Sequence, residues 1–339
     1  MRFAITQARE ENFDTEIETG FYQCFERPHH DLFLRTWQMH INSGTGQHIT
    51  EEQLRCLYER NPAGESVVAA ARQSGEWIGS VAAIPTKIHA PEGGVTKAFQ
   101  IGDFMVDPRF QGRGLGGRLL AALTRFLKSS EIPVYTFPNH RSIPIFLKQL
   151  YSELGYIPVC VVPLLPAALA SVGLLKRSSV RVLTLEEASA LADELTKPLP
   201  RPAAIVKSSE YIQWRWSLIR NVADYRFLRI ESGDDAPPVM VVWRRFKYQR
   251  VPLQLIADFV SSGSDVIPLG AVAFDGVRKG AWMSVCNIEP KMRASPPLAI
   301  RVPMKQDPRQ ARLLVPPGDT RSSNLFANSR FVMGDWMGV

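Results

Sequence analysis

A run of glycines with neighbouring arginines is the part of this sequence best suited to chemistry. Residues 102–120 read Gly-Asp-Phe-Met-Val-Asp-Pro-Arg-Phe-Gln-Gly-Arg-Gly-Leu-Gly-Gly-Arg-Leu-Leu. Glycines let a phosphate group approach the backbone closely, and the first N–H groups of a helix have no partner within that helix. Because the helix dipole also favours an anion there, the run predicts either a pyrophosphate cradle or a glycine-rich turn with a solvated basic face. The nearby positive charges are Arg109, Arg113 and Arg118.

Two common phosphate-binding loops do not fit this run. A P-loop requires a Gly-Lys-Ser/Thr ending, which the sequence lacks. A Rossmann fingerprint requires its glycine turn after the first strand of a parallel βαβ unit. Here several strand-like segments precede the glycines, which argues against that fold.

The elements that must position this loop follow from hydrophobic periodicity. Gly75 and the pair Gly93-Gly94 separate strand-like runs, which predicts an antiparallel meander. After Gly112 the apolar residues recur at helical spacing. The first half is therefore expected to be α+β. Its expected elements are a strand at 3–6, helices at 10–24, 31–40 and 51–60, strands at 66–71, 77–90 and 97–106, a helix at 113–127, a strand at 134–137 and a helix at 144–154.

The second half repeats the pattern of the first. Ile256-Ala-Asp-Phe-Val aligns with Ile101-Gly-Asp-Phe-Met, and Asn287 aligns with Asn139. The offsets nearly agree, at 155 residues for the aspartates and 148 for the asparagines. Such a period indicates an internal duplication. The expected organisation is a catalytic domain at 1–165, a linker at 166–179 and a degenerate copy at 180–339.

The order of meander, glycine-opened helix, strand and helix resembles the GNAT family of N-acetyltransferases. Gln111-Gly-Arg-Gly-Leu-Gly116 is similar to that family's Gln/Arg-x-x-Gly-x-Gly/Ala loop for coenzyme A pyrophosphate. Downstream, Asn139 and the run Tyr151-Ser-Glu-Leu-Gly-Tyr156 resemble the family's Asn and Tyr-x-x-x-Gly-aromatic ending. The interval from Asn139 to Tyr151 is 12 residues, longer than the family pattern. The resemblance is specific over about residues 66–160 and implies a tandem GNAT fold, each copy a mostly antiparallel mixed sheet flanked by helices.

The resemblance also implies roles for individual residues. Acetyl-CoA is the implied co-substrate, and Tyr151 is the implied acid that protonates the leaving thiolate. Asp103 is the candidate base, although its counterpart Asp258 persists in the second copy, which points to a shared structural role; a water relay is the alternative. The residues implied to bind the cofactor are Met105, Val106, Gln111, Gly112, Arg113, Gly114, Leu115, Gly116, Gly117 and Asn139.

The second copy is expected to have lost its cofactor loop. After Asp258-Phe-Val the chain reads Ser261-Ser-Gly-Ser-Asp-Val-Ile, which contains one glycine. Asp265 places a negative charge where a pyrophosphate would lie. This copy is therefore expected to be non-catalytic, covering an open sheet edge and shaping the acceptor cleft.

Composition restricts the classes of partner. The 339 residues fit two domains, and Lys plus Arg exceed Asp plus Glu by 40 to 33. That excess suits an anionic ligand but is too dilute to indicate nucleic acid. Four separated cysteines favour a reduced, cytoplasmic protein, and the six histidines show no metal-ligand spacing. Residues 155–175 carry no charge, but prolines interrupt them, so a spanning helix is not expected and contact with a membrane surface is left open.

Two functions of different classes remain from the sequence. The first is an acetyl-CoA-dependent N-acetyltransferase acting on a primary amine of a small molecule, with an amino sugar as one option. A longer-chain or carrier-protein-bound acyl donor is a variant of it. The second is a binding or regulatory protein in which the fold holds a ligand without turnover. The acceptor and the oligomeric state are not predicted.

Overall fold

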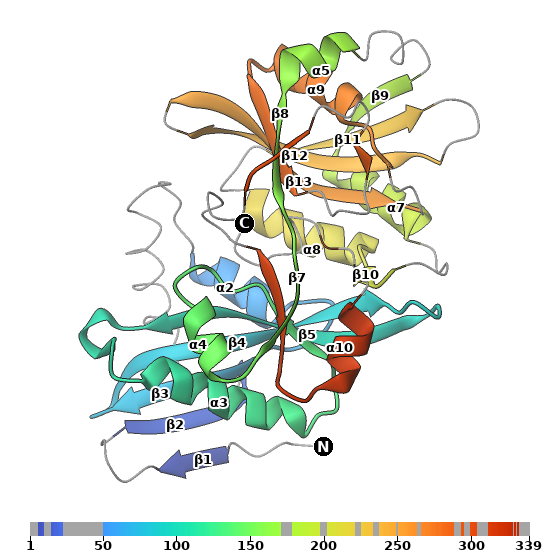
Figure 1. Cartoon of the computed structure of the whole chain (residues 1–339). Helices are drawn as coiled ribbons and strands as arrows, with labels where there is room; N and C mark the ends of the chain where they lie inside the picture. Colours follow the sequence, from blue (N-terminus) through green and yellow to red (C-terminus); the bar gives the residue numbers. More distant parts are fainter. Residues whose placement is uncertain are drawn as a thin grey trace.

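The structure is a computed structural model of the whole chain. It describes residues 6–9, 15–22, 50–170, 178–196, 202–220, 225–232, 237–248, 250–262, 266–287, 293–294, 299–303, 311–327, 329 and 331. Two mixed sheets with helices on their faces make up this part of the chain (Figure 1).

The first sheet has nine strands, in the order β1-β2-β3-β4-β5-β6-β18-β7, with β10 paired to β4. The predicted meander corresponds to β3, β4 and β5, which pair antiparallel, while β6 joins β5 in parallel. The strands are β1 (Thr6–Arg9), β2 (Thr15–Phe21), β3 (Val67–Gln73), β4 (Glu76–His89), β5 (Val95–Val106), β6 (Val134–Thr136), β7 (Ser152–Tyr156), β10 (Ala204–Ile205) and β18 (Arg312–Val315). The helices beside it are α2 (Glu51–Tyr58), α3 (Leu115–Lys128), α4 (Ile143–Lys148) and α10 (Thr320–Phe326), with a 3₁₀ turn at Pro108–Phe110.

The second sheet has seven strands, in the order β17-β8-β15-β13-β12-β11-β9. A separate parallel pair joins β14 to β16. The strands are β8 (Val159–Pro163), β9 (Ser178–Leu183), β11 (Tyr225–Ser232), β12 (Val239–Tyr248), β13 (Val251–Ser261), β14 (Val266–Ile267), β15 (Met283–Asn287), β16 (Arg293–Ala294) and β17 (Ile300–Arg301). The helices are α5 (Leu164–Ala170), α7 (Leu185–Leu195), α8 (Ser209–Arg220) and α9 (Leu269–Arg278).

The two halves exchange strands near their ends. β8 follows β7 directly in the chain but pairs with β15 in the second sheet. β18, close to the end of the chain, returns to the first sheet and lies between β6 and β7. Figure 1 shows this crossing, with β7 and β8 running as one green ribbon from one sheet to the other. The division at residues 165 and 180 stays a prediction, because each sheet contains a strand from the other side of it.

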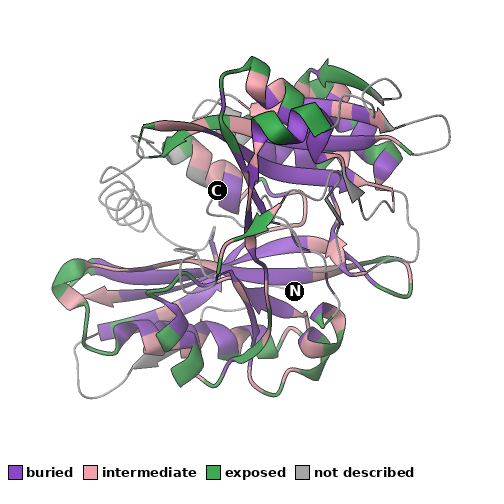
Figure 2. Ribbon diagram, turned by 45° about the horizontal axis from the view of Figure 1, so that its top comes forward, coloured by how far each residue is buried: buried purple, intermediate pink, exposed green. Residues whose placement is uncertain are grey.

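Helix α3 lies on one face of the first sheet because one side of it is apolar. Leu119, Leu120 and Leu123 are fully buried against the sheet. The helix approaches β4 closely at Gly79, where an added Cβ would lie 3.1 Å from the Leu119 side chain. The buried colouring of Figure 2 follows this inner face of α3.

A second apolar core lies between the two sheets and includes residues from both halves. Tyr58 at the end of α2 is buried there, and so is Trp216 on α8. The indole Nε1 of Trp214 donates a hydrogen bond of 2.7 Å to the carbonyl oxygen of Cys56, which joins α8 to α2. Figure 1 shows α2 and α8 between the sheets. Helices of the second half therefore cover the first sheet on the face opposite α3.

Two predicted elements are wrong. The helix expected at 10–24 is a strand over Thr15–Phe21, where Thr15, Ile17 and Thr19 are buried and the glutamates between them are not. This two-residue alternation is a strand period, although its inward residues are partly polar. The helix expected at 144–154 ends at Lys148, because Leu150 adopts a φ of 61° and the chain then enters β7.

Among the described residues, no helix is long and apolar enough to cross a bilayer. The described part of the chain also brings together no cluster of three metal-ligating side chains. Of the cysteines, Cys56 is half-buried, Cys160 and Cys286 are buried, and Cys24 lies outside the described residues.

Candidate active site

The glycine loop leaves open space in front of the start of α3. Gly112 and Gly114 both have a φ of 77°, and a Cβ added at either would meet no atom within 4 Å. Gly114 is the N-cap of α3, and no side chain caps this end. The first N–H groups of α3, beginning at Leu115, therefore have no partner from a capping side chain. This is the geometry expected of an anion cradle.

The next two glycines have a packing function. A Cβ at Gly116 would lie 2.8 Å from the ring of Phe104 and 3.3 Å from Ile145. A Cβ at Gly117 would lie 3.3 Å from the side-chain nitrogen of Gln149. These glycines let the first turn of α3 sit against β5 and α4. A contact of either with a cofactor stays a prediction.

Several charged and polar side chains of the loop form contacts with the loop itself or with the strands next to it. The exposed Arg109 pairs with the half-buried Asp107 at 2.8 Å and with the exposed Glu76 at 3.3 Å. The Arg113 guanidinium lies over the Phe110 ring, 5.6 Å from its centre. Gln111 donates a hydrogen bond of 2.9 Å from Nε2 to the carbonyl oxygen of Val106, which fixes the loop to the end of β5.

The end of β5 separates from β6 just before the loop. Pairing between these strands covers Phe99 to Ile101, and the Thr136 hydroxyl donates to the Ile101 carbonyl oxygen at 2.8 Å. Beyond that point β5 keeps its pairing with β4 alone, including Met105 with Ser80. The register between β4 and β5 shifts at this position, which indicates a β-bulge. Among the described strands, none pairs with the backbone of residues 102–106 on the β6 side, so an extended ligand could add to this backbone.

Asp103 lies in this bulge with a φ of 48°, uncommon for a residue other than glycine. Its carboxylate accepts a hydrogen bond of 2.6 Å from the Tyr58 hydroxyl. Burial raises the pKa of Asp103 to about 6, against the opposing effects of the Tyr58 hydrogen bond and the positive charge of Arg215. A carboxyl group that titrates near neutral pH is suited to accept a proton from a substrate. Its neighbour Phe104 contacts α3 instead, so the two side chains point to opposite faces of the sheet.

Tyr151 lies in the apolar core beneath α3. Its hydroxyl is 2.7 Å from the Thr124 hydroxyl, and its ring packs edge-on against Phe146. Burial raises the pKa of Tyr151 above its usual value. Protonation of a thiolate by this hydroxyl would require it to leave the contact with Thr124. The structure thus assigns Tyr151 a packing contact, and its role as an acid stays a prediction. Tyr135 is fully buried as well.

Asn139 lies in the turn that precedes the short helix α4, whose N-cap is Ser142. Its side-chain oxygen accepts hydrogen bonds from the backbone N–H groups of Arg141 and Ser142, each 3.0 Å long. The residue is exposed at the surface. Such an Asx turn accounts for an asparagine here without a ligand, and the predicted cofactor contact is untested.

The fold thus brings the glycine loop, the splayed end of β5 and Asp103 to one region. Sequence reasoning assigned no role to Tyr58 or Arg215, which the structure places around Asp103. Tyr58 ends a helix far from Asp103 in the sequence, and Arg215 comes from the second half. No local spacing connects them, and only the packing of α2 and α8 could reveal them.

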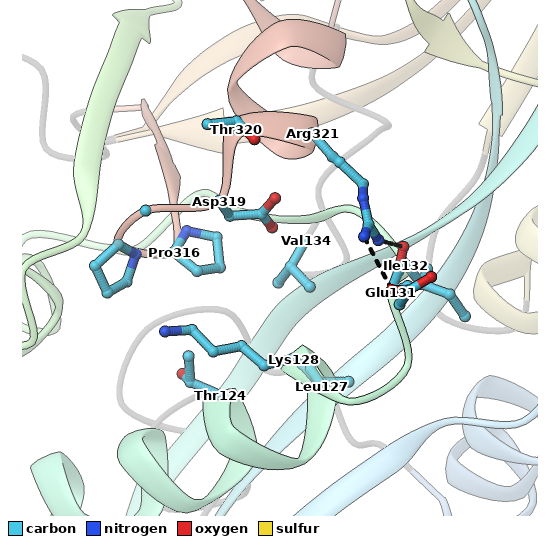
Figure 3. Close-up of a pocket in the computed structure, with 12 residues that line it drawn as sticks. Thr124, Leu127, Lys128, Glu131, Ile132, Val134, Pro316, Asp319, Thr320 and Arg321 are labelled. Carbon is cyan, nitrogen blue, oxygen red and sulfur yellow. Dashed lines mark hydrogen bonds and ion pairs between the residues drawn. The ribbon is translucent and has the colours of Figure 1, made fainter.

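A pocket of about 340 Å³ lies at the other end of α3. Figure 3 shows Lys128 and Glu131 on one side and Asp319 and Arg321 on the other. Arg321 pairs with Glu131 at 3.2 Å. Since an α-helix rises 1.5 Å per residue, the pocket is roughly 15 Å along α3 from the glycine loop. It is not part of the candidate site.

Comparisons with known proteins agree with this arrangement. Residues 30–151 match the model of the acetyltransferase (GNAT) family. A search of curated proteins gave no match. Solved structures are similar to nearly the whole chain, which confirms the predicted fold class.

Three of these structures illustrate the similarity. A conserved protein from Enterococcus faecalis V583, described as a probable N-acyltransferase, is 11% identical with a TM-score of 0.60, covering 88% of this chain and 72% of its own. A GCN5-related N-acetyltransferase from Anabaena variabilis is 12% identical with a TM-score of 0.58, covering 87% and 72%. Another from Kribbella flavida is 13% identical with a TM-score of 0.53, covering 89% and 71%. Residues 30–151 of this chain are therefore similar to the acetyltransferase (GNAT) family, and the solved structures share the fold of nearly the whole chain.

Proposed function

We propose that this protein transfers an acetyl group from acetyl-CoA to a primary amine of a small molecule. The family supports acyl transfer. The observation that carries the finer proposal is the open glycine cradle at the start of α3, which adjoins an unpaired strand end and a carboxyl group that titrates near neutral pH.

The residues of the cradle fit coenzyme A. A side chain at Gly112 or Gly114 would occupy the open space, so the glycines there keep room for a bulky anionic group. The N–H groups at the start of α3 would hold the pyrophosphate, with Arg113 beside them. The backbone of Met105 and Val106 would receive the pantetheine arm. When bound, acetyl-CoA supplies an activated thioester.

Asp103 is proposed as the base that accepts the proton of the acceptor amine, directly or through water. With its pKa at about 6, the carboxyl group is mostly ionised at pH 7 while remaining a useful proton acceptor. The Tyr58 hydrogen bond fixes its orientation. Arg215 stabilises the ionised form from the second half.

The proton for the departing thiolate has two candidate sources. Tyr151 is the donor that the family resemblance implies, but its contact with Thr124 favours a packing role. Water reaching the open side of the loop is the other. Replacing Tyr151 separates the two, as described in the Discussion.

The second half is proposed to be non-catalytic and to complete the acceptor side of the site. It contributes α8, whose Trp214 bonds to Cys56 of α2. The loop expected to replace its cofactor cradle includes Asp265, which lies outside the described residues. We place the protein in the cytoplasm because its four cysteines are widely separated in the sequence and form no CxxC pair.

The experiment is thiol release from acetyl-CoA measured against a panel of primary amines that includes amino sugars. The Asp103→Asn variant is the matched control, because the amide keeps the Tyr58 hydrogen bond but cannot accept a proton. We expect amine-dependent release that this variant reduces, with acetyl-CoA affinity preserved. A protein that binds acetyl-CoA without release for any amine favours the binding-protein alternative. If thiol is released only from longer-chain acyl-CoA or from an acylated carrier protein, then that compound and not acetyl-CoA is the acyl donor.

A further inference from the structure

One end of the second sheet gathers exposed apolar side chains. β12 and β13 form a hairpin, and Tyr248 lies exposed at its tip. β15 starts beside this tip, because it pairs in parallel with β13 through Met283 and Leu253. Trp282, just before β15, is 68% exposed, and its N–H donates to the Pro252 carbonyl oxygen at 2.9 Å. Tyr248 and Trp282 are thus brought to the same end of the sheet from separate parts of the chain.

Helix α5 extends this apolar surface. The N–H of Leu164 donates to the Trp282 carbonyl oxygen at 3.1 Å, so α5 begins beside Trp282. Leu164 points into the core, whereas Leu165, in the same turn, is 59% exposed. Leu169 is exposed one turn later on the same side. Figure 2 shows the outer surface of α5 coloured as exposed.

Positive charges surround these residues. Lys247 and Arg250 flank the hairpin tip, and Lys279 follows the end of α9; all three are exposed. The described residues of β8, α5, β12, β13, α9 and β15 include two acidic side chains. Asp258 is buried and paired with Lys207, and Asp275 is paired with Arg226. The surface formed by Leu165, Tyr248, Trp282, Lys247, Arg250 and Lys279, here called the hairpin surface, is therefore cationic.

We propose that the hairpin surface docks on an anionic membrane surface. Tryptophan and tyrosine favour the level of the lipid headgroups, and leucine favours the acyl boundary below it. Lysine and arginine around them are attracted to anionic headgroups. Exposing the apolar side chains of Trp282 and Leu165 to water is unfavourable, whereas docking on a lipid surface would bury both. Leucine on the outer side of α5 has no favourable contact with a nucleic acid backbone, so a lipid surface fits better than RNA.

This docking accounts for the uncharged stretch at 155–175. In its described part, residues 155–170, the end of β7 is followed by β8, where Cys160 and Val162 are buried in the second sheet. Its next part forms α5, which exposes Leu165 and Leu169. The stretch therefore serves as a core strand followed by a half-exposed apolar helix. The inference does not depend on the proposed reaction, since it concerns the far end of the other half.

The test is co-sedimentation of the full chain with phosphatidylcholine vesicles with and without phosphatidylglycerol, in the absence of acetyl-CoA. We expect binding to the anionic vesicles alone. The triple variant Lys247→Gln, Arg250→Gln, Lys279→Gln should bind about 100-fold more weakly, from roughly fivefold per charge. The matched control Arg125→Gln, Lys128→Gln removes two exposed charges from the last turn of α3 and should leave binding unchanged.

Tryptophan fluorescence supplies a second readout. Among the described residues, the tryptophans at 77, 214, 216 and 243 are already buried, whereas Trp282 is exposed; Trp37 and Trp336 lie outside the described residues. Vesicle binding should shift the emission to the blue, and Trp282→Phe should abolish most of that shift while the variant still sediments. The proposal is overturned if anionic vesicles do not bind, or if the triple variant binds as well as the parent. If the parent protein binds single-stranded RNA but not vesicles, and the triple variant loses that binding, the partner of the hairpin surface is a nucleic acid and not a membrane.

Discussion

Asp103 and Asp258 occupy equivalent places in the two sheets, yet their surroundings differ. Both lie where the register between two antiparallel strands shifts. Asp103 accepts a hydrogen bond from the Tyr58 hydroxyl, and its pKa is raised to about 6. Asp258 forms an ion pair with the buried ammonium of Lys207 and also accepts from the N–H of Phe259. The aspartate at this position therefore titrates near neutral pH in the first half, whereas its equivalent in the second half is held in a buried ion pair.

The helices that follow these strands also differ, because the first begins next to open space and the second begins in a packed core. α3 begins at Gly114, which has open space before it and no capping side chain. α9 begins after Pro268 with Leu269 and Gly270 buried, and it packs against α5. The asparagines also differ, since Asn139 is exposed and Asn287 is buried, donating to the carbonyl oxygens at 157 and 158. This comparison supports the proposal that the second half is a copy whose ligand positions are filled.

Exchanging the two aspartates for asparagine tests this comparison most directly. Asp258→Asn leaves the Lys207 ammonium buried without its counter-charge, which should lower the free energy of unfolding by about 3–5 kcal/mol. Asp103→Asn should preserve stability and reduce turnover by about 10²-fold or more. Urea denaturation and steady-state rates measure the two effects. Equal losses of stability in both variants would remove the distinction between the sites.

The pH dependence of the reaction sharpens the role of Asp103. A base must be ionised, so kcat/KM should fall as the pH drops below about 6, where Asp103 becomes protonated. Arg215→Gln removes a charge that lowers this pKa, and should move the midpoint to higher pH, whereas Arg215→Lys should not. A midpoint that does not respond to Arg215→Gln would argue that the second half does not influence the base.

Substitutions in β18, the strand that the second half contributes to the first sheet, should have the next largest effect, on stability. Leu314 on β18 is fully buried in the first sheet, although it comes from the end of the chain. Leu314→Ala should cost about 2–5 kcal/mol of stability. Ile300→Ala on β17, an exposed edge position, should change stability by less than about 0.5 kcal/mol. Denaturation monitored together with acetyl-CoA binding is the measurement, and a Leu314 variant as stable as the control would contradict the pairing.

Filling the cradle should weaken cofactor binding in the first half alone. A carboxylate at Gly114 would crowd and repel the pyrophosphate, and charge-assisted contacts are worth about 1.5–3 kcal/mol each, so affinity should fall by roughly 10- to 100-fold. Gly93→Asp is the matched control, since Gly93 also has a positive φ and open surroundings. Asp265→Gly should leave affinity unchanged. Calorimetry should give one site per chain; two equal sites would show that the second half also binds.

Tyr151→Phe carries the smallest expected effect. If the hydroxyl serves the contact with Thr124, its loss should cost about 1 kcal/mol of stability and change turnover by less than about threefold. Thr124→Val should cost a similar amount, and the double variant should show that the two losses are not additive. If turnover instead falls by about 10²-fold with acetyl-CoA affinity unchanged, Tyr151 is the acid.

The sequence alone determined the parts of this protein that depend on neighbours along the chain. Strand-like runs separated by glycine turn signals predicted β3, β4 and β5, and helical spacing predicted α3, whose apolar side faces the core. The glycines at 112 and 114 predicted the open loop, since few other residues adopt a φ of 77°. The partly polar alternation of β2 was missed because its buried positions include threonines.

The tertiary structure alone decided which distant segments meet. The exchange of β8 and β18 between the sheets leaves no mark in local periodicity, because a strand has the same pattern whichever sheet receives it. Likewise, nothing near Asp103 or Asp258 in the sequence tells that one faces a tyrosine and the other a lysine. The proton affinity of a carboxyl group is set by burial and by the charges around it, and these come from helices folded in from elsewhere in the chain.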